Sequence, residues 1–170
     1  MVRCSTREIC LMFVCASVSC LINTYPIKAI LSNLNTNAPA LGMAIFGGFI
    51  FVFWISLAYK IVNKPYSGVF TSLLIVSLCL LISPWYGVVK PEWFGIYGIF
   101  AFFAMGVLIE KLNGGFGNLA CLLITWFALI IHANVKIPLN IGILLAIISF
   151  ISGFAGDKFA SFMVKYVLNH

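Results

Sequence analysis

Long uncharged stretches alternate with short charged segments along the whole chain. The uncharged stretches cover residues 9–27, 29–59, 65–89, 93–109, 112–135 and 137–156. A helix needs about 20 mostly apolar residues to cross a bilayer, so each stretch is long enough for one crossing. The spacing of the charges therefore predicts six membrane spans.

Prolines, glycines and polar residues at the ends of these stretches set the expected helix limits. The spans are expected at about 9–31, 41–60, 67–83, 93–110, 117–134 and 138–157, within one transmembrane domain that covers residues 1–170. A transmembrane β-barrel would require alternating apolar and polar residues, whereas residues 43–57 are apolar on every side. The fold class predicted is an all-α integral membrane protein, a six-transmembrane-helix bundle.

Composition excludes a water-soluble globule, because 63% of the residues are hydrophobic and only 8% are charged. The net charge of +6 would suggest nucleic-acid binding in a soluble chain, but here the basic residues lie singly in the loops. The predicted partner is therefore the lipid bilayer, and no nucleic acid is expected.

Basic residues are divided unequally between the two sets of loops, and cytoplasmic loops are enriched in Lys and Arg. The loops on the side of the termini hold seven of the ten: Arg3, Arg7, Lys60, Lys64, Lys111, Lys158 and Lys165. Lys28, Lys90 and Lys136 lie on the other side. We expect both termini in the cytoplasm and a multi-pass protein of the cell (plasma) membrane.

The first span admits a second interpretation as a removable signal peptide, because Arg3 and Arg7 precede an apolar run. Two features favour a retained span. Glu8 interrupts the basic region, and apolar residues resume through Leu31.

Patterns for catalysis or metal binding are not found in the sequence. It has no Ser/His/Asp set, no His-x-x-x-His, no Cys-x-x-Cys and no phosphate-binding glycine loop. Glu8, Glu110 and Asp157 are placed at inner span ends, whereas an ion-coupled pump usually keeps a carboxylate in mid-membrane. We expect no enzyme activity, no cofactor and no metal, and interpret the six cysteines as small packing residues.

Small residues recur every four positions in two predicted spans. Ala40, Ala44 and Gly48 form one such stripe, and Ser152, Gly156 and Ala160 form another. Small residues let helix backbones approach closely in lipid. The stripes could pack within this chain or could dock a second membrane protein.

Polar and aromatic residues collect on the predicted outer side of a chain that has few polar side chains elsewhere. The candidate substrate-binding residues are Tyr25, Asn35, Trp85, Glu92, Trp93, Tyr97, Trp126, His132 and Asn134. Aromatic faces suit a planar or cationic small molecule, and the polar groups could orient it. The alternative is an interface belt, because Trp and Tyr are enriched at membrane surfaces. His132 is aligned with Thr125 two turns deeper, which favours an orientation into the bundle.

Several local patterns resemble the substrate-binding membrane subunit, or S component, of energy-coupling-factor (ECF) vitamin transporters. The segments that carry the resemblance are Pro39-Ala40-Leu41-Gly42, Ile45-Phe46-Gly47-Gly48, Lys64-Pro65-x-x-Gly68 with Thr71, Ser83-Pro84-Trp85-Tyr86-Gly87, Gly106-Val107-Leu108-Ile109-Glu110 and Gly114-Gly115-Phe116-Gly117-Asn118. They cover roughly residues 38–120.

The resemblance implies a six-span bundle that captures a vitamin or vitamin precursor from outside. It also implies partners, namely a scaffold membrane subunit and cytoplasmic ATPases that supply the energy. The family typically has an Ala-x-x-x-Ala docking stripe on the first span. This chain has Cys15-x-x-x-Ser19 and Ala16-x-x-x-Cys20 there.

The function expected from these observations is substrate binding for an ATP-driven importer of a vitamin-like small molecule. The alternative is a non-catalytic structural or assembly subunit of a larger membrane complex. A membrane enzyme is a third possibility, against which stands the absence of a nucleophile paired with a base.

Overall fold

The computed structural model describes residues 4–24, 39–82, 94–134 and 138–168, and all regular secondary structure in these ranges is helical. The elements are α1 (Thr6–Thr24), α3 (Pro39–Gly47), η1 (Gly48–Val52), α4 (Phe53–Val62), α5 (Ser67–Ile82), α6 (Phe94–Lys111), α7 (Gly114–Ala133) and α8 (Leu139–Leu168). The predicted all-α class is confirmed for this part of the chain.

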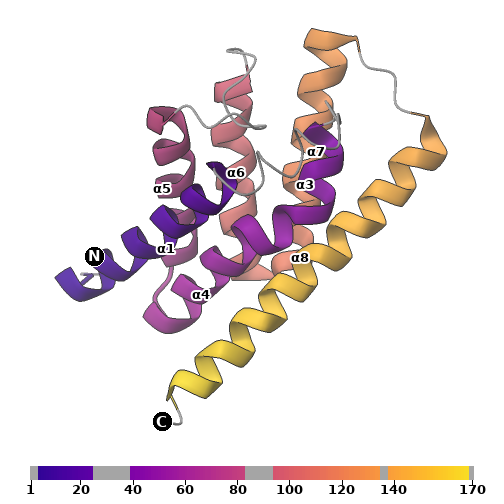
Figure 1. Cartoon of the computed structure of the whole chain (residues 1–170). Coiled ribbons are helices and arrows are strands. Elements are labelled where there is room, and N and C mark those ends of the chain that lie inside the picture. Colours follow the sequence, from indigo (N-terminus) through magenta and orange to yellow (C-terminus); the bar gives the residue numbers. More distant parts are fainter. Residues whose placement is uncertain (1–3, 25–38, 83–93, 135–137, 169–170) are drawn as a thin grey trace.

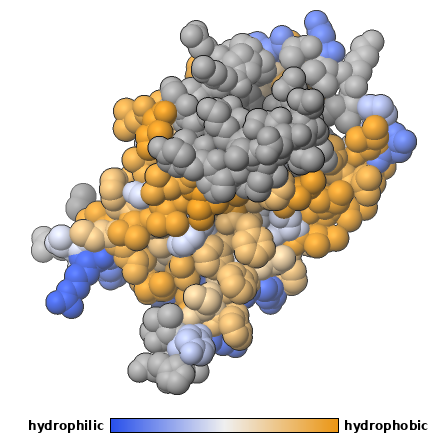
Figure 2. Space-filling view, in the orientation of Figure 1, coloured by the Kyte–Doolittle hydropathy of each residue, from blue (hydrophilic) through white to orange (hydrophobic). Residues whose placement is uncertain are grey.

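Four helical segments in the described ranges are long and apolar enough to cross a membrane, namely Thr6–Asn23, Gly42–Val62, Gly114–His132 and Leu139–Tyr166. Helix α5 is a shorter apolar helix. Figure 2 shows a mainly hydrophobic visible surface among the described residues, with hydrophilic residues toward its two ends. Together these features indicate a membrane protein.

The distribution of side chains also differs from that of a soluble domain. Large apolar residues such as Phe100, Phe127 and Ile147 point outward, whereas the polar side chains of Asn118 and Ser149 are fully buried. Lipid tolerates exposed apolar groups but offers no hydrogen-bond partner to polar ones. The outward apolar surface therefore fits a lipid environment.

One continuous helix made of α3, η1 and α4 lies at the centre of the arrangement. It contacts α1, α5, α6, α7 and α8 along its length. Helices α5, α6 and α7 lie side by side, and the central helix and α8 cross them obliquely (Figure 1). The central helix thereby positions the other elements relative to one another.

A π-helical turn, η1, interrupts the central helix and is held by side chains from two other helices. The Ser19 hydroxyl of α1 donates to the Ile50 carbonyl at 2.5 Å. The Ser152 hydroxyl of α8 donates to the Ile45 carbonyl at 2.7 Å and accepts from the Gly48 N–H at 3.2 Å. Because a π turn disturbs the regular i to i−4 pairing, these serines satisfy backbone groups where the helix widens.

The small-residue stripe of α8 packs inside this chain. A Cβ atom on Gly156 would lie 2.8 Å from the Gly48 carbonyl carbon, and a Cβ atom on Gly114 would lie 2.6 Å from the Gly153 carbonyl oxygen. Ala160 is fully buried. Of the two interpretations of the stripe, the structure supports close packing of α8 on the central helix and α7.

The small residues of α1 are buried in the same way. Cys15, Ala16, Ser19 and Cys20 are each at most 4% exposed. These are the residues at the place of the family's docking stripe, and here they face this chain's own helices.

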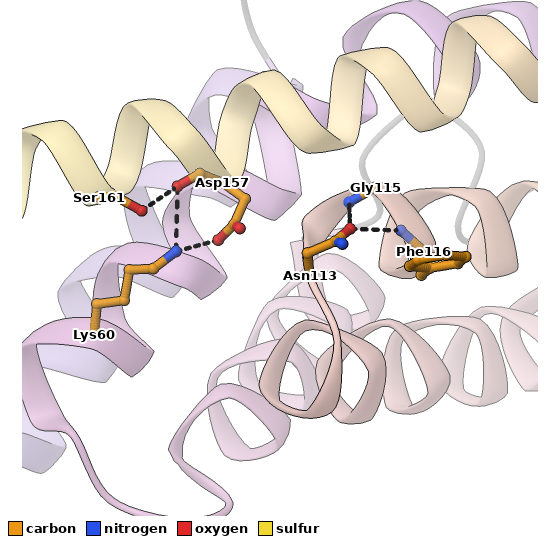
Figure 3. Close-up of polar contacts among 6 residues, drawn as sticks. All are labelled: Lys60, Asn113, Gly115, Phe116, Asp157 and Ser161. Carbon is orange, nitrogen blue, oxygen red and sulfur yellow. Dashed lines mark hydrogen bonds and ion pairs between the residues drawn. The ribbon is translucent and has the colours of Figure 1, made fainter.

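Several helix ends differ from the predicted span ends by two or three residues, and local chemistry explains two of these differences, whereas the end of α8 differs by more. Helix α7 begins at Gly114, because the Asn113 side chain caps it by accepting from the N–H groups of Gly115 and Phe116 (Figure 3). Helix α4 continues to Val62 and ends where Asn63 adopts a left-handed conformation with φ of 49°. Helix α8 continues to Leu168, past the predicted end at residue 157.

Candidate functional site

One end of the bundle is held together by charged side chains from helices far apart in sequence. Lys60 of α4 forms an ion pair with the Asp157 carboxylate of α8 and also donates to the Asp157 carbonyl at 3.2 Å (Figure 3). Lys64 pairs with Glu8 of α1 at 2.7 Å. The start of α1, the end of α4 and the C-terminal half of α8 therefore lie at the same end.

Glu110 joins α6 to the first turn of α5 at this charged end. Its carboxylate accepts hydrogen bonds from the backbone N–H groups of Tyr66, Gly68 and Val69 at 3.0, 2.7 and 3.2 Å. These are N–H groups that a helix start leaves without intrahelical partners, and the helix dipole favours an anion there. Tyr66 is held in the left-handed region with φ of 68°.

All three acidic side chains in the described ranges are thus used in contacts at the charged end. Glu8 of α1 pairs with Lys64, in the segment between α4 and α5. Glu110 of α6 accepts from the first turn of α5, and Asp157 of α8 pairs with Lys60 of α4. These contacts hold the helix ends together at the charged end of the bundle.

Tyr97 and His132 form a polar contact at the opposite end of the bundle. Tyr97 lies in the first turns of α6 and His132 in the last turn of α7, and the Tyr97 Oη and His132 Nε2 atoms are 2.9 Å apart. Their rings meet edge to face, with centroids 5.4 Å apart and an interplanar angle of 69°. The Tyr97 side chain is half-buried, and the His132 side chain is exposed. Of the predicted site residues, these two are brought together.

His132 does not point into the bundle as its alignment with Thr125 suggested. Thr125 is buried and its hydroxyl donates within the helix, to the Cys121 carbonyl at 2.8 Å. The stripe passes from buried to exposed because His132 lies in the last turn of α7. Its ring is oriented toward α6 and Tyr97.

Two further predicted site residues, Trp126 within α7 and Asn134 at its C-terminal end, form no hydrogen bond or ring contact with the Tyr97–His132 pair in the described structure. Trp126 packs against the buried cluster of Ala44, Leu122 and Leu145, between α3 and α8. Its indole Nε1 is buried without a hydrogen-bond partner in the described part of the chain. Asn134 ends α7 in a left-handed conformation with φ of 50°, and its side chain is exposed. The remaining predicted site residues, Tyr25, Asn35, Trp85, Glu92 and Trp93, lie outside the described residues.

Asn118 is a buried polar residue that the sequence analysis did not include in the site. Its side-chain amide donates to the Ser149 carbonyl at 2.9 Å, and its carbonyl oxygen approaches the Gly47 Cα so closely that no Cβ would fit there. An amide side chain in the first turns of an otherwise apolar span was the available signal. The contacts assign Asn118 to joining α7, α8 and the central helix.

Two surface grooves in the described region are both apolar and contain none of the predicted site residues. The larger one, about 550 Å³, lies between α1 and α5 at the charged end and is lined by Cys4, Ile9, Met12, Pro65, Tyr66, Ser67 and Phe70. The smaller, about 320 Å³, lies between the central helix and α8. Neither has the mixture of apolar and polar groups typical of a small-molecule site.

Comparison of the chain with protein-family models, curated proteins and solved structures gives no match. The functional argument therefore rests on the geometry of the two ends of the bundle and on the resemblance noted from the sequence.

Proposed function

We propose that the chain is a six-span membrane subunit that binds a small, vitamin-like molecule at its outer end, with both termini in the cytoplasm. The proposal also holds that partner proteins supply the energy for import, as in ECF transporters. The observation that carries it is the contact between Tyr97 and His132 at the end of the bundle opposite the ion pairs.

The difference between the two ends favours an outward-facing site. The charged end holds Lys60 and Lys64 in ion pairs, and the distribution of basic residues favours a cytoplasmic position for that end. The Tyr97–His132 end then faces outward, where an importer meets its substrate.

The Tyr97–His132 pair has the chemistry to bind a polar, uncharged or weakly basic aromatic compound. A phenol hydroxyl and an imidazole each donate and accept hydrogen bonds, and both present ring edges and faces for stacking. Predicted residues such as Trp93 and Glu92 would complete the site from the segment that precedes α6.

Docking on a scaffold subunit needs a surface other than the small-residue stripes. The stripe residues of α1 are buried within this chain, as are Gly156 and Ala160 of the α8 stripe, and Ser152 is half-buried. In contrast, Ile9, Phe13, Val14 and Leu21 of α1 are exposed. An assembly subunit was suggested by the small-residue stripes as interfaces for other proteins. Because these stripes pack within this chain, they no longer favour an assembly role, and ligand binding is the better-supported function.

The test is the release of a bound compound from the purified protein. The full chain is purified in mild detergent and denatured, and the released small molecules are measured by mass spectrometry. The proposal predicts one compound at a stoichiometry close to one per chain. Protein that is folded, expressed in rich medium and free of any stoichiometric compound would contradict the proposal.

A further inference from the structure

We propose that the C-terminal end of α8 is a binding surface for anionic phospholipid headgroups, formed by Lys158, Phe162, Lys165 and Tyr166. This surface, called here the basic face of α8, is distinct from the Tyr97–His132 site. It lies at the charged end of the bundle.

The chemistry of the exposed stripe of α8 changes along its length. Its exposed residues are aliphatic or aromatic through Ile143, Ile147, Ile151 and Phe154, and then become Lys158, Phe162 and Lys165. Leu139 and Lys158 are separated by about 28 Å at 1.5 Å per residue, close to the thickness of the hydrocarbon core. The change at Lys158 therefore marks the level at which the helix reaches the headgroups.

The geometry of the helix places the four residues on one exposed face. Lys158 and Lys165 are seven residues apart, so their side chains project in nearly the same direction, and Phe162 lies between them. Phe162 is 63% exposed and Tyr166 is 61% exposed, whereas Ala160 and Val164 on the other face are buried. Two large aromatic rings with two ammonium groups form the combination found at the membrane interface.

The charges at this end are not balanced. The acidic side chains of Glu8, Glu110 and Asp157 are occupied, by Lys64, by the start of α5 and by Lys60 respectively. In the described ranges no carboxylate pairs with Lys158 or Lys165, and the Lys158 ammonium lies 5.2 Å from the centre of the Phe154 ring.

The positive charge and the aromatic rings of this surface match an anionic lipid headgroup better than they match a protein partner. Anionic lipids attract basic residues next to a membrane, at about 1 kcal/mol for each Lys near the surface. Alternation of the lysines with Phe162 and Tyr166 favours the lipid, because aromatic rings are enriched at headgroup level.

The experiment compares lipid binding by the full-length protein and matched variants in detergent. Native mass spectrometry measures the apparent affinity for phosphatidylglycerol and for phosphatidylcholine. The test variant is Lys158→Gln with Lys165→Gln, and the control is Arg7→Gln with Lys111→Gln, which removes two exposed charges from the same end of the bundle. Helix content measured by circular dichroism confirms that each variant is folded.

The parent should prefer phosphatidylglycerol, and the double variant on α8 should bind it about thirtyfold more weakly, with phosphatidylcholine binding unchanged. The control variant should lose much less than this. Equal affinity of the α8 variant and the parent for phosphatidylglycerol would overturn the proposal. So would an equal loss in the control, which would assign binding to the general charge of this end.

Discussion

Replacing Gly156 with Ala tests the close packing of α8 on the central helix. A Cβ atom at this position would lie 2.8 Å from the Gly48 carbonyl carbon and closer still to its oxygen, whereas ordinary contacts begin at 3.4 Å. The obstructing atoms are backbone, so they cannot move aside as a side chain would. The two helices would have to separate by at least about 0.6 Å.

The expected cost of Gly156→Ala follows from this geometry. Helix propensity alone would make the change stabilising by about 0.5–1 kcal/mol. Overpacking between well-packed elements costs about 1–3 kcal/mol, and separation would also weaken the Ser152 hydrogen bonds to Ile45 and Gly48. We expect a net destabilisation of about 2 kcal/mol.

The assay is the free energy of unfolding in a titration of mild-detergent micelles with SDS, followed by circular dichroism. Gly95→Ala is the matched control, because the nearest atom to its new Cβ is a methyl of the Leu80 side chain at 3.3 Å. The control should be neutral or slightly stabilising. If Gly156→Ala were as stable as the parent or more stable, the close approach of α8 to Gly48 would be wrong.

Two further predictions concern the charged end and the orientation. Asp157→Asn should lower the free energy of unfolding by about 1 kcal/mol. Adding Lys60→Gln to this variant should cost little more, because both changes remove the same ion pair. Additive losses in the same SDS titration would contradict this coupling. In a background with Cys4 and Cys10 replaced by Ser, a membrane-impermeant thiol reagent should label cysteines introduced at Asn35 and Glu92 in intact cells but not at Lys111 or Lys64. Labelling of Lys64→Cys from outside would reverse the orientation.

The helical class follows from the sequence because charge spacing and apolar length are local properties. The prediction placed the start of α7 three residues too late, at residue 117, although Asn is a favoured residue at the N-cap position that Asn113 occupies. The π turn was not predicted, because it depends on Ser19 and Ser152, which come from helices distant in sequence. The inward orientation of the α8 stripe likewise depends on which helix faces Gly156. The spacing of small residues in the sequence does not identify that helix.

The candidate site was predicted in part by the same kind of argument. Helical periodicity placed His132 on the stripe of Thr125, but periodicity within one helix does not show where a neighbouring helix ends. The contact with Tyr97 depends on the packing of α6 beside α7. Trp126 is on the same helix as His132, yet it packs toward Ala44 because α3 and α8 cover that side of α7.

The most direct test of the central claim is the affinity of the compound released from the protein for variants of the Tyr97–His132 pair. Isothermal titration calorimetry with the compound added back should show a loss of about tenfold for His132→Ala and a loss of severalfold for Tyr97→Phe. Tyr59→Phe, at the charged end, is the matched control and should bind as the parent does. Parent-like affinity in both site variants, with the compound still bound stoichiometrically, would contradict a substrate site at this end of the bundle.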